Sequence, residues 1–213
     1  MTPPRAKHEW RKQEKALYLP KVKPEVIDVP TFRFITLSGE GNPNCPAFAE
    51  CISALYSIAY GIKMTAKKQG SEPEGYFDFT VYPLEGVWDI KVAARVNFSG
   101  AINKDDLVFK LMLRQPDFVE ESFFQQIMES VKKRKPHPLH ERIKFEEITE
   151  GRCIQMLHIG SFDDEPASFR AMEEFATSLG EERRSKLHRE IYLSDFRKTP
   201  TERLKTVLRF QLK

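Results

Sequence analysis

The sequence lacks any segment that predicts membrane insertion or export. No window approaches the roughly 18 uninterrupted apolar residues of a membrane-spanning helix, and the start, MTPPRAKHEWRKQEK, has no signal-peptide core. Cysteine is scarce. Its three members, Cys45, Cys51 and Cys153, are odd in number and show no C-x-x-C spacing. Such a pattern is typical of buried thiols in a reducing compartment. We therefore expect a cytoplasmic protein without a membrane partner.

The common signatures of catalysis and cofactor binding are also missing. There is no G-x-S-x-G, no H-E-x-x-H and no G-x-G-x-x-G before a helix, and GEGNPN lacks the lysine and hydroxyl residue of a phosphate loop. The one H-x-x-H pair, His137 and His140, is flanked by prolines, which favours a loop over a metal site. His158, at the end of a predicted strand, is better explained as a hydrogen-bonded histidine than as a haem ligand. The sequence predicts no cofactor and no metal.

Positive charge is concentrated at the N-terminus. Residues 1–23 hold seven basic residues and two glutamates, although the formal net charge of the whole chain is only +3. The remaining body is therefore slightly acidic, which argues against nucleic-acid binding by it. A second basic run, Lys132 to Lys135, precedes Pro136 and is expected to end a helix. Neither run has interleaved aromatics to stack on bases, so we predict no direct nucleic-acid binding, and no protein partner is indicated.

The order of predicted elements in the first half of the chain recurs in the second half. In each half, a strand region that ends at a glycine precedes an amphipathic helix, and two further strands follow. The predicted ranges are 26–41, 46–68, 76–82 and 107–113 in the first half, and 142–160, 165–180, 187–195 and 204–213 in the second. A long irregular stretch separates the strands at 76–82 and 107–113. The two halves are joined by a helix at about 119–135.

This repeat predicts an α+β fold built from two tandem strand–helix–strand–strand modules. They would form a mainly antiparallel sheet with helices on one face and a ligand cleft on the other. We divide the chain into a basic N-terminal extension, residues 1–23, and a single domain, residues 24–213. Within the domain, repeat one covers about 24–118, the linking helix about 119–135 and repeat two about 141–213. Because only Trp10, Leu17 and Tyr18 could anchor the extension, we expect residues 1–20 to be dispensable for ligand binding.

A carboxylate and a phenol lie at the centre of an apolar strand, HREIYLSD, residues 188–195. Because side chains alternate along a strand, Ile191 and Leu193 share one face, and Glu190 and Tyr192 share the other. One interpretation is that the polar face simply meets water, as is common in antiparallel sheets. The other is that Ile191 and Leu193 lie under the helices, while Glu190 forms the floor of a cleft on the uncovered face.

Aromatic residues that the helical core does not need could line such a cleft. Tyr56 and Tyr60 lie on one flank of the predicted helix at 46–68, and Tyr76 and Tyr82 share a face of the strand at 76–82. Trp88 lies in the irregular stretch, where it could fold over the cleft as a lip. Each of them could instead be a half-buried aromatic at a domain edge. Together with one carboxylate, they predict a site for planar aromatic or cationic small molecules.

Several stretches resemble the GyrI-like small-molecule-binding family, which includes DNA gyrase inhibitory protein and the ligand domains of multidrug-sensing transcription activators. These stretches are TLSGEGNPN, ALYSIAY, YPLEGVWDI, FKLMLRQPDFV, LHIGSFDDEP and EIYLSDFRKTPTERLKTVLR, and they span about residues 24–209. PLEGVW and RQPDFV are similar to a stand-alone subfamily. Some of its members hydrolyse cyclopropane-bearing, DNA-alkylating natural products of the yatakemycin and CC-1065 type. The resemblance implies two modules around a cleft.

The resemblance also implies an aromatic cage with a central glutamate. Glu190 falls on the family's central acid, Trp88 on its LEGLW aromatic and Tyr56 on its helix aromatic. The predicted function is cyclopropanoid hydrolysis in xenobiotic detoxification, and the alternative is non-catalytic binding or sequestration of cationic aromatic drugs. The predicted catalytic residues are Glu190, as the base toward water, and Tyr56, and the predicted ligand-binding residues are Trp88, Tyr192, Tyr60 and Tyr82.

Overall fold

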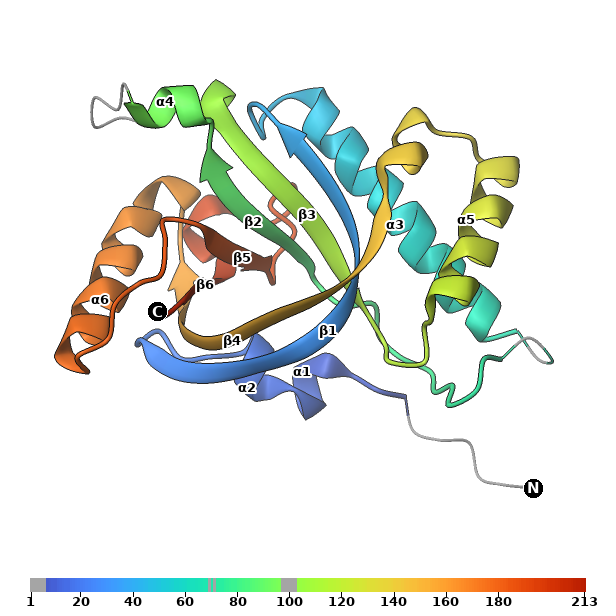
Figure 1. Cartoon of the computed structure of the whole chain (residues 1–213), viewed down its shortest axis with the longest axis horizontal. Helices are drawn as coiled ribbons and strands as arrows, with labels where there is room; N and C mark the ends of the chain where they lie inside the picture. The colour runs from blue at the N-terminus through green and yellow to red at the C-terminus, as the bar shows by residue number, and fades with distance from the viewer. Residues whose placement is uncertain (1–6, 69, 71, 97–102) are drawn as a thin grey trace.

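The computed structural model describes residues 7–68, 70, 72–96 and 103–213, and its strands form a closed barrel (Figure 1). The order around the barrel is β1-β3-β2-β5-β6-β4, and every neighbouring pair is antiparallel. The strands are β1 (Glu25–Glu40), β2 (Leu84–Ile90), β3 (Leu107–Gln115), β4 (Lys144–Ile159), β5 (His188–Tyr192) and β6 (Lys205–Gln211). The long strand β1 pairs with both β3 and β4, and this double pairing closes the barrel.

The helices lie on the outside of the barrel and across one end of it. In Figure 1, α3 and α5 lie side by side on one side, α6 lies on the other, and α1 and α2 lie below β1 and β4. The helices are α1 (Trp10–Gln13), α2 (Lys15–Tyr18), α3 (Pro46–Ala66), α4 (Val92–Val96), α5 (Glu121–Arg134) and α6 (Glu165–Ser178). Short 3₁₀ turns are η1 (Lys104–Asp106), η2 (Pro138–Arg142), η3 (Phe162–Asp164) and η4 (Thr201–Arg203). Within the described ranges, no helix is both long and apolar enough to span a membrane.

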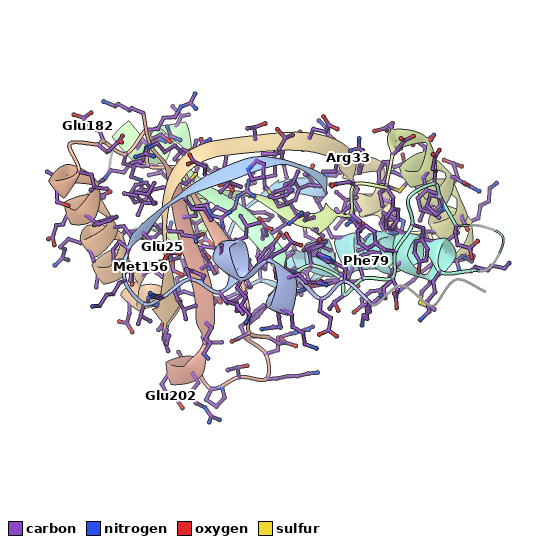
Figure 2. The ribbon with its side chains drawn as sticks, turned by 90° about the horizontal axis from the view of Figure 1, so that it is seen from below. Glu25, Arg33, Phe79, Met156, Glu182 and Glu202 are labelled. Atoms are coloured by element: carbon purple, nitrogen blue, oxygen red, sulfur yellow. The ribbon has the colours of Figure 1, made fainter. Side chains whose placement is uncertain are left out.

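The predicted repeat and fold class are confirmed. The chain runs β1-α3-β2-β3, then α5, then β4-α6-β5-β6. One strand was placed wrongly, because β2 lies at Leu84–Ile90, inside the stretch predicted to be irregular, and not at 76–82. Phe79 is buried beside α3 (Figure 2) and forms only an isolated bridge with His8. Its apolar pattern therefore reflects packing against a helix and the N-terminal segment instead of sheet pairing.

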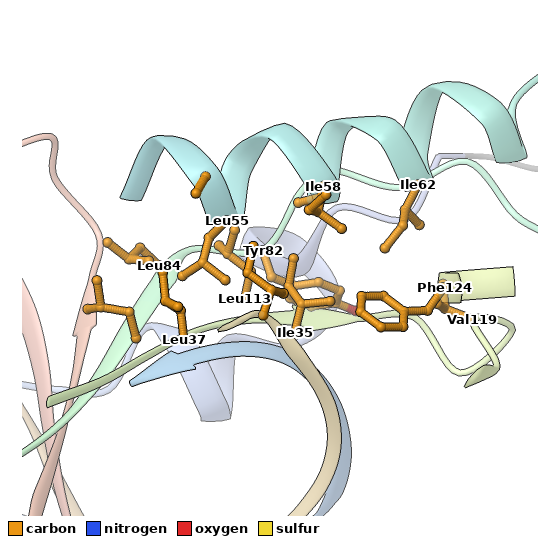
Figure 3. Packing of buried hydrophobic residues seen from close by; sticks show 14 of the residues in the cluster. Ile35, Leu37, Leu55, Ile58, Ile62, Tyr82, Leu84, Leu113, Val119 and Phe124 are labelled. Carbon is orange, nitrogen blue, oxygen red and sulfur yellow. The ribbon is translucent and has the colours of Figure 1, made fainter. Parts of the chain in front are cut away.

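The main hydrophobic core lies between α3 and the outer face of the barrel. Figure 3 shows Leu55, Ile58 and Ile62 of α3 directed at Ile35 and Leu37 of β1, and all five side chains have no exposed surface. Burial of each contributes about 1.5–3 kcal/mol relative to exposure. A smaller core joins α6 to β4 and β6; its buried members are Ile154, Met156, Met172, Ala176, Leu208, Phe210 and Leu212. In Figure 2, Met156 lies beside Glu25 of the neighbouring strand, toward the α6 end of the molecule.

The inside of the barrel is filled largely by charged side chains. Arg189 of β5 forms ion pairs with Glu85 of β2 at 2.8 Å and with Glu150 of β4 at 3.1 Å. Arg209 of β6 pairs with the same Glu150 at 2.9 Å and with Gln155 at 2.8 Å. Because the partners come from four strands around the ring, these side chains cross the interior. Each buried carboxylate there faces a guanidinium, as a buried charge requires.

The N-terminal segment closes one end of the barrel. Trp10 and Tyr18 are 3% and 2% exposed, and Arg209 donates a hydrogen bond to the Leu17 carbonyl at 2.8 Å. Glu14 accepts hydrogen bonds from Arg114 and Tyr82. This docking adds polar contacts to the three apolar anchors, so removal of residues 1–20 should expose this end of the barrel. That these residues are dispensable for ligand binding stays a prediction. The division of the chain at residue 23 stays a prediction.

The three cysteines are free, as the sequence indicates, but they are not all buried. Cys51 and Cys153 are buried, whereas Cys45 is exposed at the start of α3. Burial raises the pKa of Cys51, and it raises the pKa of Cys153 to about 12. A thiol whose pKa is raised in this way is a poor nucleophile at neutral pH.

Candidate active site in the cleft between α3 and α6

A cleft of about 1870 Å³ lies on the outer, helix-bearing face of the barrel. One wall is the α3 face that carries Phe48, Tyr56 and Tyr60, and the other wall includes Glu165 and Phe169 of α6. The floor is formed by β2 and β5. Such a site exceeds the roughly 300–1,000 Å³ of a typical drug-sized pocket, so it can accept an extended ligand.

The position of the cleft corrects one part of the predicted architecture. The prediction placed the cleft on the face without helices, but the register places Glu190 opposite Gly86 and Leu208. Leu208 belongs to the core beneath α6, so Glu190 points to the helix side, into the gap between α3 and α6. Ile191 lies on the opposite face with Arg189. Closure of the sheet turns its second face into the barrel interior, which buried charged side chains occupy.

The floor of the cleft contains a chain of hydrogen bonds that ends at Glu190. The indole Nε1–H of Trp88 donates to the Tyr192 hydroxyl oxygen at 2.7 Å, and that hydroxyl donates to Glu190 Oε2 at 2.8 Å. His188 Nε2 lies 3.1 Å from Glu190 Oε1. Burial, followed by the proximity of Glu190, raises the pKa of Tyr192 well above its usual value. Tyr192 is therefore a neutral hydrogen-bond donor at physiological pH.

A second carboxyl group, that of Glu165, faces Glu190 at the start of α6. Glu165 is only 6% exposed, and its buried Oε1 has no N–H or O–H donor within the described residues. Burial and then the neighbouring Glu190 raise the pKa of Glu165 well above its ordinary range. Two close carboxyl groups cannot both ionise without a large cost, so ionisation of Glu165 is disfavoured beside Glu190. The site thus holds two facing carboxyl groups, and the protonated form of Glu165 is favoured.

Sequence reasoning missed Glu165. It follows Asp163 and Asp164, and a run of acids at a helix N-terminus is usually explained by the helix dipole. The residue lies in LHIGSFDDEP, one of the stretches that resembles the GyrI-like family, but nothing in its spacing singles it out. Only the packing of α6 against β5 brings its carboxyl group to Glu190.

Glu165, Glu190 and His188 also offer donor atoms that lie within 4.8 Å of one another. In the described part of the chain this is the one cluster that could share a metal ion. A metal requires deprotonated ligands, whereas burial keeps a proton on Glu165. A metal ion bound here would therefore have to displace the proton that burial favours on Glu165.

Aromatic side chains form both walls above this floor. On α3, the rings of Tyr56 and Tyr60 lie 6.0 Å apart, and Tyr60 is 52% exposed. On the opposite side, Phe162 meets the ring of Tyr192 edge-on at 6.0 Å, and Phe169 meets His188 at 4.6 Å. Sequence patterns predicted neither phenylalanine for the site. For Phe169 the reason is that its spacing places it on the core stripe of its helix.

Two predicted aromatics occupy places other than those expected. Trp88 is not a lip, because it lies in β2, is 5% exposed and packs 5.7 Å from Phe48 and 5.4 Å from Phe109. It belongs to the floor of the cleft. Tyr82 borders the cleft but is 2% exposed, and its hydroxyl donates to Glu14 Oε1 at 2.8 Å. Its polar end is therefore turned away from a ligand, toward the N-terminal segment.

The charged side chains around the cleft are mostly basic. The basic ones are Arg11, Arg95, Lys104, Lys135, Arg170, Arg183, Lys186 and Arg197, and the acidic ones are Asp89, Asp163, Glu165, Glu173, Glu190 and Asp195. Several pair with each other, as in Arg197 with Asp195 at 2.9 Å and Lys104 with Asp163 at 3.0 Å. With Glu165 protonated, the surroundings are positive overall. Such surroundings do not favour a ligand selected for positive charge.

The sequence profile of the GyrI-like small molecule binding domain matches residues 23–213. The chain belongs to the GyrI-like family. It is similar to the crystal structure of a hydrolase from Listeria innocua, with 36% identity, a TM-score of 0.86 and coverage of 97% of this chain and 100% of that one. A hydrolase encoded by lin2189 from the same organism gives 36% identity, a TM-score of 0.87 and coverage of 98% and 100%.

A more distant structural likeness extends to the EcmrR C-terminal domain. That domain is 10% identical, with a TM-score of 0.52 and coverage of 90% of this chain and 97% of that one, so the likeness concerns the fold alone. No curated protein matches the sequence. The GyrI-like chain therefore has a small-molecule-binding fold, and its similar structures at 36% identity include proteins described as hydrolases.

Proposed function

We propose that this GyrI-like protein is a hydrolase that adds water to cyclopropane-bearing, DNA-alkylating aromatic compounds. The observation that carries the proposal is the carboxyl pair at the floor of the cleft. Burial keeps the proton on Glu165, which leaves Glu190 as the member able to accept a proton from water. The description of similar Listeria innocua proteins as hydrolases supports the same reaction class. The substrate class rests on the resemblance of PLEGVW and RQPDFV to the stand-alone subfamily.

The reaction needs little from the protein, because strain makes the cyclopropane carbon electrophilic. Glu190 accepts a proton from water as the new carbon–oxygen bond forms. The ring carbon–carbon bond breaks, and its electron pair moves through the conjugated system to the ligand carbonyl oxygen. That oxygen then takes a proton from solvent, and Glu190 returns its proton to solvent. The net change is the addition of one water molecule.

Tyr56 is the best placed donor for the oxygen that gains charge. Burial raises the pKa of Tyr56, so its hydroxyl remains protonated. Within the described residues, no side chain accepts the hydroxyl proton of Tyr56, whereas the proton of Tyr192 is directed to Glu190. A donor aimed at developing negative charge is a large contributor to catalysis. Tyr60, Phe162 and Phe169 would hold the planar part of the ligand between the walls.

The alternative is sequestration of cationic aromatic drugs by Glu190 without chemistry. The negative charge of the carboxyl pair and the aromatic walls favour it, whereas the mostly basic surroundings of the cleft oppose it. We propose detoxification in the cytoplasm for either activity, and the three free thiols are consistent with a reducing compartment.

The test is incubation of the purified protein with a cyclopropane alkylator, followed by mass spectrometry. We expect a product heavier than the substrate by one water molecule, formed at a rate that depends on protein concentration. Glu165→Gln mimics the protonated carboxyl and should retain much of the activity, whereas Glu165→Leu removes the hydrogen bond to Glu190 and should lose more. Binding of the compound without any hydrated product would instead support sequestration.

A further inference from the structure

Gly86 lies where the backbone does not require a glycine. It stands in the middle of β2, directly opposite Glu190 in the antiparallel ladder. Gly86 has no positive φ angle, unlike the turn glycines Gly151 and Gly180. Any residue could therefore adopt its extended conformation. The reason for a glycine at position 86 must therefore lie in the space that a side chain would occupy.

That space is filled by the hydrogen bond between Trp88 and Tyr192. A Cβ atom at Gly86 would lie 2.8 Å from Trp88 Nε1 and 3.1 Å from the Tyr192 hydroxyl oxygen. Both distances are shorter than ordinary van der Waals contact, so a methyl group would push the two polar atoms apart or lift them from the strand. The absence of a side chain at Gly86 therefore leaves the space in which Trp88 and Tyr192 form this hydrogen bond.

The chemistry of indole gives the chain of hydrogen bonds a direction. Indole Nε1–H is a donor only, so Trp88 must occupy an acceptor position of the Tyr192 hydroxyl. The hydroxyl proton of Tyr192 then points at its other near neighbour, Glu190 Oε2. A hydrogen bond donated to a carboxylate favours the ionised form of that carboxylate. Glu165 has no comparable donor at its buried oxygen.

We propose that Gly86 and Trp88 are positioning residues, which direct the Tyr192 proton to Glu190 and so select Glu190 as the ionised member of the carboxyl pair. This inference rests on the proposed function for its catalytic meaning. The division of roles between two chemically identical side chains then comes from the hydrogen-bond chain on β2 and β5. His188, whose Nε2 lies 3.1 Å from Glu190 Oε1, faces the same carboxyl group from β5 and acts alongside this chain.

The test is a titration of the glutamate side-chain carboxyl carbons by carbon-13 NMR in the ligand-free protein. The Glu190 signal is assigned by its absence in Glu190→Gln. In Gly86→Ala we expect its titration midpoint to rise by about one pH unit or more, because a hydrogen bond to a charged group is worth about 1.5–3 kcal/mol. Trp88→Phe keeps an aromatic ring but removes the N–H, and should raise the midpoint by a smaller amount.

Gly61→Ala is the matched control. A Cβ at Gly61 would lie 2.8 Å from Val131 and 3.0 Å from Ile127, so it strains the α3–α5 contact in a similar way far from the carboxyl pair. We expect this control to leave the Glu190 midpoint unchanged. If Gly86→Ala does not fold, Trp88→Phe alone decides the question. An unchanged midpoint in every folded variant would show that Gly86 and Trp88 serve packing only, and would overturn the inference.

The titration needs no substrate, so it separates this inference from the proposed reaction. A raised midpoint without hydration of any cyclopropane compound would uphold the positioning role and reject the reaction. Hydration by the wild type, with an unchanged Glu190 midpoint in Gly86→Ala and Trp88→Phe, would uphold the reaction and reject the positioning role. If both hold, the acid limb of the pH–rate profile should move upward with the midpoint in the same variants.

Discussion

Strand β5 carries two buried charged residues side by side, and its two faces use charge in opposite ways. Arg189 points into the barrel, where it neutralises Glu85 and Glu150. Glu190, the next residue, points into the cleft, where it meets a second carboxyl group, a tyrosine and a histidine. Each interior carboxylate has an arginine, whereas the described residues place none against Glu190.

This difference separates charges that hold the fold from charges that are available for chemistry. Inside the barrel, burial raises the pKa of Glu85, while Arg189 and Arg209 act in the opposite direction. In the cleft, burial and the neighbouring Glu190 both raise the pKa of Glu165, and the described residues supply no compensating cation. A perturbed carboxyl group in an open cleft without a cationic partner is the arrangement expected of a reactive site.

Removing the interior cation should have the largest effect. Arg189→Met leaves Glu85 and Glu150 buried without their shared partner, and we expect the free energy of unfolding to fall by about 3–5 kcal/mol. Urea unfolding followed by circular dichroism measures it. The control is Arg152→Met, which breaks a more exposed pair with Glu181 and should cost about 1 kcal/mol or less. Equal losses in the two variants would contradict the structural role of the interior pairs.

Changing the cleft carboxylate should affect turnover and leave the fold intact. Glu190→Gln keeps the shape of the side chain but cannot accept a proton, so hydration of a cyclopropane alkylator should slow by about 10²–10⁴-fold. Fluorescence titration should show that neutral planar ligands still bind. Glu129→Gln, at an exposed position of α5 that does not border the cleft, is the control and should keep near-normal rates. If the wild type shows no hydration and Glu190→Gln selectively loses affinity for cations, the result would favour sequestration over hydrolysis.

The contact between Glu14 and Arg114 should make the barrel sensitive to acid. Burial opposes ionisation of Glu14, but Arg114, His8 and Tyr82 outweigh it and lower its pKa. Because the folded-state pKa is lowered, this stabilisation is complete above the unfolded value of about 4.3 and is lost as the pH falls through the folded value. Glu14→Gln should therefore destabilise the protein by about 1–3 kcal/mol at pH 7 and less at pH 3.

Thermal unfolding at several pH values measures this difference for Glu14→Gln. Glu50→Gln, at an exposed position of α3, should show no such pH-dependent difference from the wild type. A loss for Glu14→Gln that is the same at pH 3 and pH 7 would mean that its charge is not what holds the N-terminal segment.

The smallest expected effect concerns the exposed wall of the cleft. Tyr60→Ala removes a ring that is half exposed and lies beside Tyr56. Stacking on such a ring is worth about 0.5–1.5 kcal/mol, so the affinity for a planar aromatic ligand should fall about twofold to tenfold. Met64→Ala, an exposed α3 residue that does not border the cleft, is the control for fluorescence titration. An unchanged affinity in Tyr60→Ala would place the ligand deeper than this wall.

The architecture and the central glutamate could be predicted from the sequence because both follow from alternation and repetition. The helix stripe at 46–68 and the alternation around Glu190 are local patterns. Closure of the sheet is not local, since it depends on β1 pairing with both β3 and β4. For that reason the side of the sheet that carries the cleft was predicted wrongly, and Trp88 was expected at the rim when it lies in the floor.

Glu165 and the N-terminal segment show the same limit. Nothing near Glu165 in the sequence indicates a carboxyl partner, because Glu190 lies on a strand formed much later in the chain. Trp10 and Tyr18 gain their burial from the open end of a barrel that sequence patterns do not predict. Local periodicity identifies which side chains share a face, but the direction in which that face points and the neighbours that it meets are decided by tertiary pairing.

The closed ring of strands also bears on how the protein behaves in a crowded solution. In the described ladder each of the six strands is paired on both sides over part of its length, whereas residues 25–32 of β1 and 144–152 of β4 pair on one side only. Exposed edges are the usual starting points for strand-to-strand aggregation. The strands of the cleft floor, β2 and β5, are paired on both sides, so the exposed Tyr60 at the mouth of the cleft is available to ligands without a strand edge beside it that another molecule could extend.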